Sequence, residues 1–354
     1  MKSTQKRASA RSEIRVLQSV PPPTDAVNPY IELLVRSLPE SIEVTYFTWR
    51  QALTSDFDVF HLHWPEVKIR GRTAWRSVTK TILFLLILVR IKVTRTALVR
   101  TIHDVAPHET ASVLQRWVIA LSERWTTMWI SLSPAITPPR GVPSVVIPHG
   151  HYRDWFDPIA RRPSKPGRIV HFGQLRPYKG TSQLVAAFTS LPDPGLSLRI
   201  LGPAPDADLK RSLVELCAHD PRVDIRAEYV PDAELAHEIM EAELVVLPFV
   251  RIWNSGSLLL ALSLDRPVLT SSAATAQELA DEVGVGWIQI YDGQFDAEIL
   301  ASAVESTQQH PPKGRPDLSL RTWSRIGEAH AAAYARARAV AARSEHEGEG
   351  SPPS

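Results

Sequence analysis

Residues 168–180 read Arg-Ile-Val-His-Phe-Gly-Gln-Leu-Arg-Pro-Tyr-Lys-Gly, which combines a strand pattern with a basic, glycine-containing loop. The apolar run 168–172 predicts a buried strand, and the periodic pattern that begins at Thr181 predicts a helix. Between them lie two glycines and the two cations Arg176 and Lys179. Backbone N–H groups, a helix N-terminus and positive side chains together favour a bound phosphate group. A solvated basic turn is the alternative interpretation of the same residues.

Strands and helices alternate on both sides of this stretch. Apolar runs of strand length recur between longer helical patterns, which predicts parallel sheets covered by helices. We therefore expect an α/β fold with two Rossmann-like domains. The strands expected before residue 168 are 14–17, 59–62, 98–102, 129–132 and 145–147, and those after it are 198–201, 223–226, 244–247 and 267–270.

The composition along the chain suggests where the domains begin and end. Residues 157–168 hold three prolines and four basic residues, which is typical of a linker. The last eleven residues are rich in Glu, Gly, Pro and Ser, which is typical of a disordered tail. We expect a disordered N-terminus over 1–11, a first domain over 12–157, a linker over 158–167, a second domain over 168–319, a helix over 320–343 that packs back toward the first domain, and a disordered tail over 344–354.

The composition excludes several classes of protein. A chain of 354 residues with 44% hydrophobic and 22% charged residues is neither disordered, collagen-like nor membrane-spanning. A net charge of +2 gives no argument for a nucleic-acid partner. The single cysteine, Cys217, cannot form an intrachain disulfide, and the basic N-terminus lacks the apolar core of a secretory signal. We therefore expect a cytoplasmic protein.

A second motif covers residues 247–268. Asn254 and Ser255 are residue types that cap helix N-termini, and Gly256 allows a ligand to approach the first helical turn, which continues with Ser257. Such a turn can bind an anion without a cation. A capped helix that buries its leucines is the alternative interpretation, and both can hold together.

These two loops resemble the sugar-nucleotide domain of GT-B glycosyltransferases of family 4 and its relatives. In that family a basic loop holds the donor diphosphate, and a helix lies beneath the ribose and the phosphates. The resemblance implies a GT-B fold, a nucleotide-diphosphate sugar as donor, and neither a cofactor nor a metal. It implies that the diphosphate lies against Gly173, Arg176, Lys179, Gly180, Asn254, Ser255, Gly256 and Ser257.

The chain departs from the family 4 pattern at two places. Gln174 stands where the family often has arginine, so the cationic role passes to Arg176. The paired glutamates of the donor helix align with Ile252 and Leu260, so both carboxylates are missing. The short motifs are more similar to xanthan-type GDP-mannose:glycolipid 4-β-mannosyltransferases, which implies GDP-mannose as donor and a lipid-linked or polysaccharide acceptor. A GT-B epimerase or hydrolase of sugar nucleotides, or a non-catalytic partner subunit, remain as alternatives.

The first domain holds the candidates for the acceptor side. His103 and Asp104 follow an expected strand, where ligand-facing residues lie in open α/β sheets. Either could accept the proton of an acceptor hydroxyl, and we expect an inverting displacement. His103 could instead be a structural histidine. His61 and His63 point the same way from one strand and, with Glu66, are acceptor-side candidates. A metal site there lacks a clear third ligand.

The sequence Asp206-Ala-Asp208 looks like the metal-binding Asp-x-Asp of GT-A transferases. It stands directly before a helical pattern, so helix capping explains it better.

The segment 67–100 is basic and holds no acidic residue. It encloses the apolar run 82–89, which is far shorter than the ~20 residues that span a bilayer. A basic segment around an apolar helix suits an anionic membrane surface, which predicts a peripheral position at the inner face of the plasma membrane. A core helix with basic flanks is the alternative. The nine cations are Lys68, Arg70, Arg72, Arg76, Lys80, Arg90, Lys92, Arg95 and Arg100.

Overall fold

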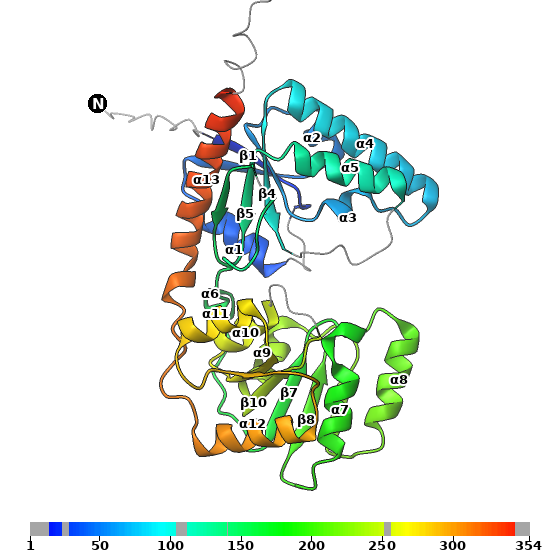
Figure 1. The fold of residues 1–354 in the computed structure, drawn as a ribbon, viewed down its shortest axis with the longest axis vertical. Coiled ribbons are helices and arrows are strands. Elements are labelled where there is room, and N and C mark those ends of the chain that lie inside the picture. The colour runs from blue at the N-terminus through cyan, green and yellow to red at the C-terminus, as the bar shows by residue number, and fades with distance from the viewer. Residues whose placement is uncertain (1–13, 23–27, 104–111, 140, 251–255, 344–354) are drawn as a thin grey trace, which may run out of the picture. The chain divides into compact units, whose positions relative to one another are not determined.

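The computed structural model describes residues 14–22, 28–103, 112–139, 141–250 and 256–343. The chain forms two compact units: unit 1 comprises residues 1–149 and 323–354, and unit 2 comprises residues 150–322. Each unit holds one six-stranded parallel sheet flanked by helices (Figure 1). This is the GT-B arrangement of two Rossmann-like units, so the predicted fold class is confirmed.

Unit 1 has the strand order β2-β1-β3-β4-β5-β6, with Val16 of β1 paired to Val44 on one side and to Val59 on the other. Its strands are β1 (Ile14–Gln18), β2 (Ile42–Tyr46), β3 (Val59–Leu62), β4 (Ala97–Ile102), β5 (Met128–Ser131) and β6 (Ser144–Val146). Its helices are α1 (Pro29–Ser37), α2 (Trp49–Thr54), α3 (Pro65–Ile69), α4 (Ala74–Val93), α5 (Val113–Arg124) and α13 (Trp323–Arg343).

Unit 2 has the strand order β12-β11-β10-β7-β8-β9. Its strands are β7 (Arg168–Phe172), β8 (Ser197–Leu201), β9 (Val223–Arg226), β10 (Leu244–Leu247), β11 (Val268–Ser271) and β12 (Ile288–Tyr291). Its α-helices are α6 (Arg153–Phe156), α7 (Thr181–Thr189), α8 (Ala207–Cys217), α9 (Asp232–Met240), α10 (Gly256–Ser263), α11 (Ala274–Val283) and α12 (Ala297–Gln309), and two 3₁₀ turns are η1 (Pro177–Lys179) and η2 (Ser319–Arg321).

Each sheet has one point at which the strand order reverses. In unit 1 this point lies between β1 and β3, and in unit 2 it lies between β7 and β10. Open parallel sheets bind their ligands beyond the carboxyl ends of the strands at such points. The fold therefore marks one candidate region in each unit, before any side chain is considered.

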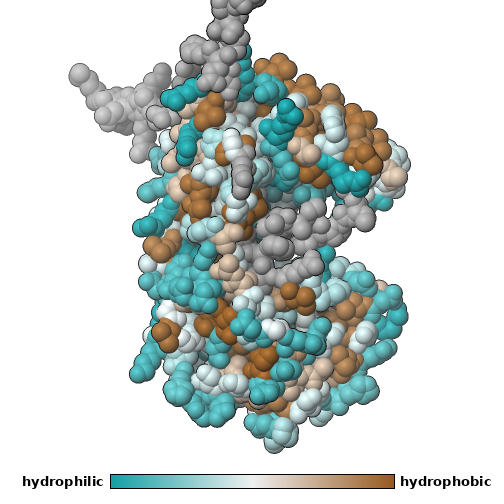
Figure 2. Space-filling view, viewed as in Figure 1, coloured by the Kyte–Doolittle hydropathy of each residue, from teal (hydrophilic) through white to brown (hydrophobic). Residues whose placement is uncertain are grey.

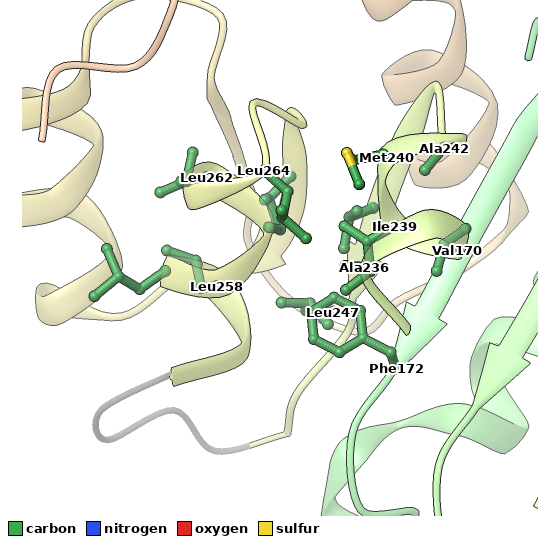
Figure 3. Close-up of a cluster of buried hydrophobic side chains, with 14 of the residues drawn as sticks. Val170, Phe172, Ala236, Ile239, Met240, Ala242, Leu247, Leu258, Leu262 and Leu264 are labelled. Atoms are coloured by element: carbon green, nitrogen blue, oxygen red, sulfur yellow. The ribbon is translucent and has the colours of Figure 1, made fainter. Parts of the chain in front are cut away.

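A buried apolar cluster fixes the helix that follows β10. Phe172 of β7 and Leu247 of β10 pack with Ile239 of α9 and with Leu258 and Leu262 of α10 (Figure 3). Burial of these side chains is the main force that holds α10 against the sheet. The interpretation of residues 256–263 as a helix that buries its leucines is confirmed.

The division between the units differs from the predicted boundaries. Residues 150–167, expected as the end of the first domain and a linker, belong to unit 2. The Tyr152 N–H donates to Ser263 Oγ at 2.8 Å, and Lys165 forms an ion pair with Glu241 at 2.6 Å. These bonds tie the segment to unit 2. The expected disordered ends, 1–11 and 344–354, lie outside the described residues.

Helix α13 belongs to unit 1, although 173 residues of unit 2 separate it from the rest of that unit. It packs against α1 and β4. At Gly327 a Cβ atom would lie 1.9 Å from the carbonyl oxygen of Ser37, so only glycine allows this close crossing of α1 and α13.

Candidate active site

The two phosphate-type loops of unit 2 meet at the reversal point of its sheet. One loop follows β7 and the other follows β10. The Val250 N–H donates to the carbonyl oxygen of Tyr178 at 2.9 Å, which joins the two loops directly. Gly180 has a φ of +70°, and a Cβ there would lie 2.1 Å from the carbonyl oxygen of Pro248. The second glycine of the basic loop is therefore required by both its dihedral angle and its neighbour.

The first glycine of the basic loop faces the start of α10. Gly173 has a φ of +113°, and a Cβ there would lie 3.3 Å from Ser257 Oγ. Gly256, the first residue of α10, lies next to the Tyr152 hydroxyl. The structure thus brings together four of the predicted diphosphate residues, Gly173, Gly180, Gly256 and Ser257. Asn254 and Ser255 lie outside the described residues.

The two cations of the basic loop are held in place by neutral neighbours. Arg176 Nε donates to Gln174 Oε1 at 2.9 Å, so the glutamine that replaces the family's arginine orients the remaining one. Lys179 Nζ lies 3.8 Å from the centroid of the Phe249 ring. Within the described part of the chain, Arg176 has no ion-pair partner. Its positive charge is not neutralised by a protein carboxylate there, so it can act on an anion.

A buried histidine fixes the start of α7. His171 Nδ1 lies 2.8 Å from the carbonyl oxygen of Val246, and its Nε2 lies 3.1 Å from Thr181 Oγ1. Because the carbonyl only accepts, His171 donates from Nδ1 and accepts the Thr181 hydroxyl proton at Nε2. Burial lowers the pKa of His171 to about 4, which keeps it neutral. The residue before α7 is Gly180, which has no side chain to cap the helix, and the first N–H groups of α7 lie beside the basic loop.

A pocket whose described lining residues are uncharged opens at the carboxyl ends of β10, β11 and β12, with a volume of about 760 Å³. Phe249, whose ring lies beneath Lys179, is part of its wall. Hydroxyl, amide and aromatic groups line it, which suits a neutral polar ligand. The side chains that supply these groups are Gln183, Ser271, Ser272, Tyr291, Gln294 and Phe295.

Three histidines gather at the reversal point of the other sheet, in unit 1. His61 lies on β3, His63 directly follows it, and His103 directly follows β4. The ring centroids of His61 and His63 are 4.1 Å apart, so the two rings lie on the same side, as predicted. His63 Nδ1 lies 3.0 Å from His103 Nε2. His61 and His63 are buried, whereas His103 is partly exposed.

The other ring nitrogens of the buried pair also have partners. His61 contacts the hydroxyl groups of Tyr334 and Thr101 at 2.8 Å each. His63 Nε2 lies 2.9 Å from Gln18 Oε1. Both nitrogens of each ring are therefore engaged in hydrogen bonds. Among the described residues, no group of three or more His, Cys, Asp or Glu side chains could hold a metal ion.

Aromatic rings enclose His103. Trp64 stacks on it with centroids 4.2 Å apart, and Tyr30 meets it edge-on at 5.5 Å. Burial, followed by the charges of His149 and His330, lowers the pKa of His103 to about 3, so the ring is neutral at pH 7. A neutral ring has the protonation state that a base needs. Asp104, the other predicted base, lies outside the described residues.

The remaining predictions concern carboxylates. Glu66 lies on α3, is partly exposed, and acts electrostatically on Arg100. Asp206 accepts hydrogen bonds from the N–H groups of Asp208 and Leu209, both at 2.9 Å, at the start of α8. The capping interpretation of Asp206-Ala-Asp208 is confirmed.

Three comparisons with known proteins agree on the kind of protein. A family model described as "Glycosyl transferases group 1" matches residues 166–309, a range that includes both loops of unit 2. A GDP-mannose:glycolipid 4-beta-D-mannosyltransferase of Xanthomonas campestris pv. campestris is 42% identical over 332 residues, which is 94% of this chain and 95% of the relative. This chain belongs to the same glycosyltransferase family. These relatives do not favour the two alternatives. The first was a GT-B epimerase or hydrolase of sugar nucleotides, and the second was a non-catalytic partner subunit.

Solved structures with low sequence identity share the fold of this glycosyltransferase. The Anabaena protein HepE in complex with UDP and glucose has a TM-score of 0.58 at 14% identity, and the alignment covers 94% of this chain and 99% of that one. A glycosyltransferase from Rickettsia africae ESF-5 has a TM-score of 0.56 at 15% identity, with 95% and 97% covered.

The basic segment of the glycosyltransferase does not form one patch. Arg90 donates to the carbonyl oxygens of Ala52 and Ser55, and Arg100 is buried beside Glu123. Lys68 lies over the Phe47 ring, and burial lowers its pKa to about 8. These cations face the protein, because the two helices and the strand that carry them pack in unit 1. Those that remain exposed are Arg70, Arg72, Arg76, Lys92 and Arg95.

Helix α4 is apolar on two faces. One face packs in the core of unit 1 through Phe84, Ile87, Leu88 and Ile91. The opposite face exposes an apolar stripe with a spacing of three or four residues, and Figure 2 shows apolar side chains gathered over this part of unit 1. None of the described helices is long and apolar enough to cross a membrane. The apolar stripe consists of Trp75, Val78, Ile82, Leu86, Val89 and Val93.

Proposed function

We propose that this glycosyltransferase transfers mannose from GDP-mannose to a glycolipid. The observation that carries the proposal is the meeting of the two loops at the reversal point of unit 2, where Gly180 contacts Pro248 and Gly173 faces Ser257. The choice of GDP-mannose and of a glycolipid rests on the name of the Xanthomonas campestris relative.

Arg176 and Lys179 would bind the diphosphate of the donor. When the bond between the anomeric carbon and the phosphate oxygen breaks, negative charge increases on the diphosphate. Two cations and the N–H groups at the starts of α7 and α10 stabilise that charge, and they do so more strongly in the transition state than in the ground state. This difference is what accelerates the reaction.

His103 would accept the proton of the acceptor hydroxyl. A β-mannoside formed from an α-linked sugar nucleotide requires inversion at the anomeric carbon, and a single displacement needs a base on the acceptor side. Leu260 of α10 stands where family 4 enzymes have a glutamate. The proposed reaction therefore does not use that carboxylate of the donor helix.

Nucleotide binding tests the donor assignment. A ligand that binds only the folded protein stabilises it, and the melting temperature rises roughly with the logarithm of the ligand concentration divided by its Kd. We expect GDP and GDP-mannose to raise the melting temperature more than UDP, ADP or their sugars do, and we expect Arg176→Ala with Lys179→Ala to abolish the shift. Equal shifts with all nucleotides would contradict the GDP assignment.

We also propose that unit 1 binds an anionic membrane surface through α4. The apolar stripe is exposed along the helix, with Trp75 at 65% and Val93 at 75% exposure. Exposed cations flank it, and α5, which packs beside α4, adds the exposed apolar residues Val113 and Trp117. Apolar side chains beside cations are what a helix lying in a membrane interface presents.

Vesicle binding separates the two contributions. Arg72→Gln, Arg76→Gln and Lys92→Gln should weaken binding to anionic vesicles and reduce its salt dependence, because each removes an exposed cation. Ile82→Asn with Leu86→Asn should weaken binding at every salt concentration. Val214→Asn, at an exposed apolar residue of unit 2, is the matched control. A wild-type protein that ignores anionic vesicles at low salt would overturn the proposal.

A further inference from the structure

One continuous row of hydrogen bonds runs through the core of unit 1 and ends at His103. It begins at Thr101, passes to His61 and then to Tyr334 of α13, each at 2.8 Å. Gln18 Nε2 donates to the Tyr334 hydroxyl at 3.2 Å. From Gln18 Oε1 the row continues to His63 Nε2 at 2.9 Å, and from His63 Nδ1 to His103 Nε2 at 3.0 Å. The row joins β1, β3, β4 and α13.

The chemistry of each group gives this row a direction. The amide oxygen of Gln18 faces His63 and can only accept, so His63 must carry its proton on Nε2. A neutral imidazole has one N–H, so His63 Nδ1 holds a lone pair. His103 therefore donates from Nε2 to His63, and the lone pair of His103 is on Nδ1.

Both histidines are held neutral, as this argument requires. Burial is the main cause of the lowered pKa of His63 and of His103, and neighbouring histidines add to it. Among the described residues, the titratable groups that contact His103 or act on it electrostatically are His63, Tyr30, His149 and His330. Of these, Tyr30 and His149 also contact each other, with centroids 4.5 Å apart.

We propose that Gln18 is a positioning residue that, through His63, fixes the tautomer of His103 with an unprotonated Nδ1, the nitrogen that takes the acceptor proton. The inference rests on the proposed function, in which His103 is the base. In the reaction, the acceptor O–H bond breaks and its proton moves to His103 Nδ1. The acceptor oxygen bonds to the anomeric carbon, and the diphosphate leaves with the electron pair of the broken C–O bond. The imidazolium keeps its Nε2–H bond to His63.

The test reads the tautomer and the rate separately. In protein labelled with nitrogen-15 in its histidines, protonated and unprotonated ring nitrogens have well-separated chemical shifts, and His103→Gln identifies the His103 signals. We expect an unprotonated Nδ1 and a protonated Nε2 in the wild type. Gln18→Leu leaves the Nε2–H of His63 without an acceptor, so we expect the opposite tautomer and a kcat roughly tenfold to a hundredfold lower. The donor KM should stay unchanged, because the donor loops lie in unit 2.

Two variants control for a purely structural effect. Gln18→Glu keeps an oxygen toward His63 and should restore both the tautomer and most of the rate. Tyr334→Phe removes the hydroxyl beside Gln18 but leaves the bond from His63 to Gln18, so the tautomer should persist even if stability falls.

The outcomes separate this inference from the proposed function. A protonated Nδ1 on His103 in the wild type overturns the inference without any need for a variant that folds. An unchanged tautomer and kcat in Gln18→Leu, together with an inactive His103→Gln, overturns the inference but leaves His103 as the base. A fully active His103→Gln overturns the base itself.

Discussion

At the scale of single residues, the proposed chemistry depends on neutral groups that orient charged or reactive ones. Gln174 orients Arg176 by accepting from its Nε, and Gln18 accepts from His63. In both cases a neutral amide oxygen accepts the orienting hydrogen bond, so no negative charge is added. The positive charge of Arg176 is therefore not neutralised by Gln174 and can act on the substrate.

The cations of the basic loop carry the first residue-scale prediction. Arg176→Ala with Lys179→Ala should lower kcat/KM for the sugar nucleotide by at least a hundredfold, because each group stabilises charge that develops in the transition state. Lys210→Ala with Lys313→Ala, which removes two exposed lysines of the same unit, is the control. Steady-state kinetics with circular dichroism checks both. Wild-type turnover of the first double variant would reject the assignment of the loop.

The second prediction for single residues compares two glycines. Gly180 and Gly314 have nearly the same backbone angle, with φ of +70° and +74°, but only Gly180 has an atom in the space of a Cβ. Gly314→Ala should cost about 1 kcal/mol of unfolding free energy, from the dihedral angle alone. Gly180→Ala should cost more and should also weaken nucleotide binding, since the loop must move away from Pro248. Equal effects in denaturant unfolding and nucleotide titration would show that the close approach does not matter.

At the scale of elements, some parts of this molecule could be predicted from the sequence and others could not. The first loop could be predicted because two glycines, two cations and a helix start lie within residues 173–181, and the second because residue types that cap helices precede Gly256. The edge strands β2 and β12 were missed, although the edge strands β6 and β9, whose residues are also partly exposed, were predicted. The bond between Gln18 and Tyr334 spans 316 residues of sequence, and no local pattern indicates such a pair.

The segment around helix α4 shows that the number of cations in a sequence does not predict which of them are exposed. The sequence contains nine cations in 67–100, but the fold turns Arg90 and Arg100 toward the protein. Which cations face outward depends on packing, which the sequence does not display. The apolar stripe is the stronger feature for a membrane surface, because exposed apolar side chains in a row are uncommon in a protein without a partner.

The C-terminal helix gives a prediction about pH. His330 of α13 is fully buried, donates from Nδ1 to the carbonyl oxygen of Ile326, and has a pKa lowered by burial to about 4. In the unfolded chain its pKa returns to about 6.5. Between about pH 4 and pH 6.5 the unfolded state binds more protons than the folded state does. The contribution of His330 to the free energy of unfolding is therefore fully present above about pH 6.5 and is lost as the pH falls toward 4.

His330→Gln should therefore flatten the decrease in unfolding free energy on acidification, by up to about 1.4 kcal/mol per pH unit. Urea unfolding at a series of pH values between about 5 and 7 measures this slope. His219→Gln, at an exposed histidine of unit 2, is the control. A slope equal to that of the wild type would show that His330 is not buried in its neutral form.

At the scale of the whole molecule, the two units carry different parts of the proposed reaction. Unit 2 holds the loops for the diphosphate, and unit 1 holds His103 and the apolar stripe of α4. In unit 2 the two loops follow β7 and β10, the strands at the reversal point of the sheet, whereas in unit 1 His63 follows β3 at the reversal point and His103 follows the neighbouring strand β4. The proposed donor site and the proposed acceptor-side base therefore both lie beyond the carboxyl ends of strands, where open parallel sheets bind ligands.

We propose that the enzyme transfers mannose with inversion from GDP-mannose to a glycolipid. The most direct measurement is to incubate it with GDP-mannose and membrane glycolipid and to determine the anomeric configuration of the new linkage by NMR. We expect a β-mannoside and one GDP released per linkage. An α-mannoside, or free mannose without transfer, would contradict it.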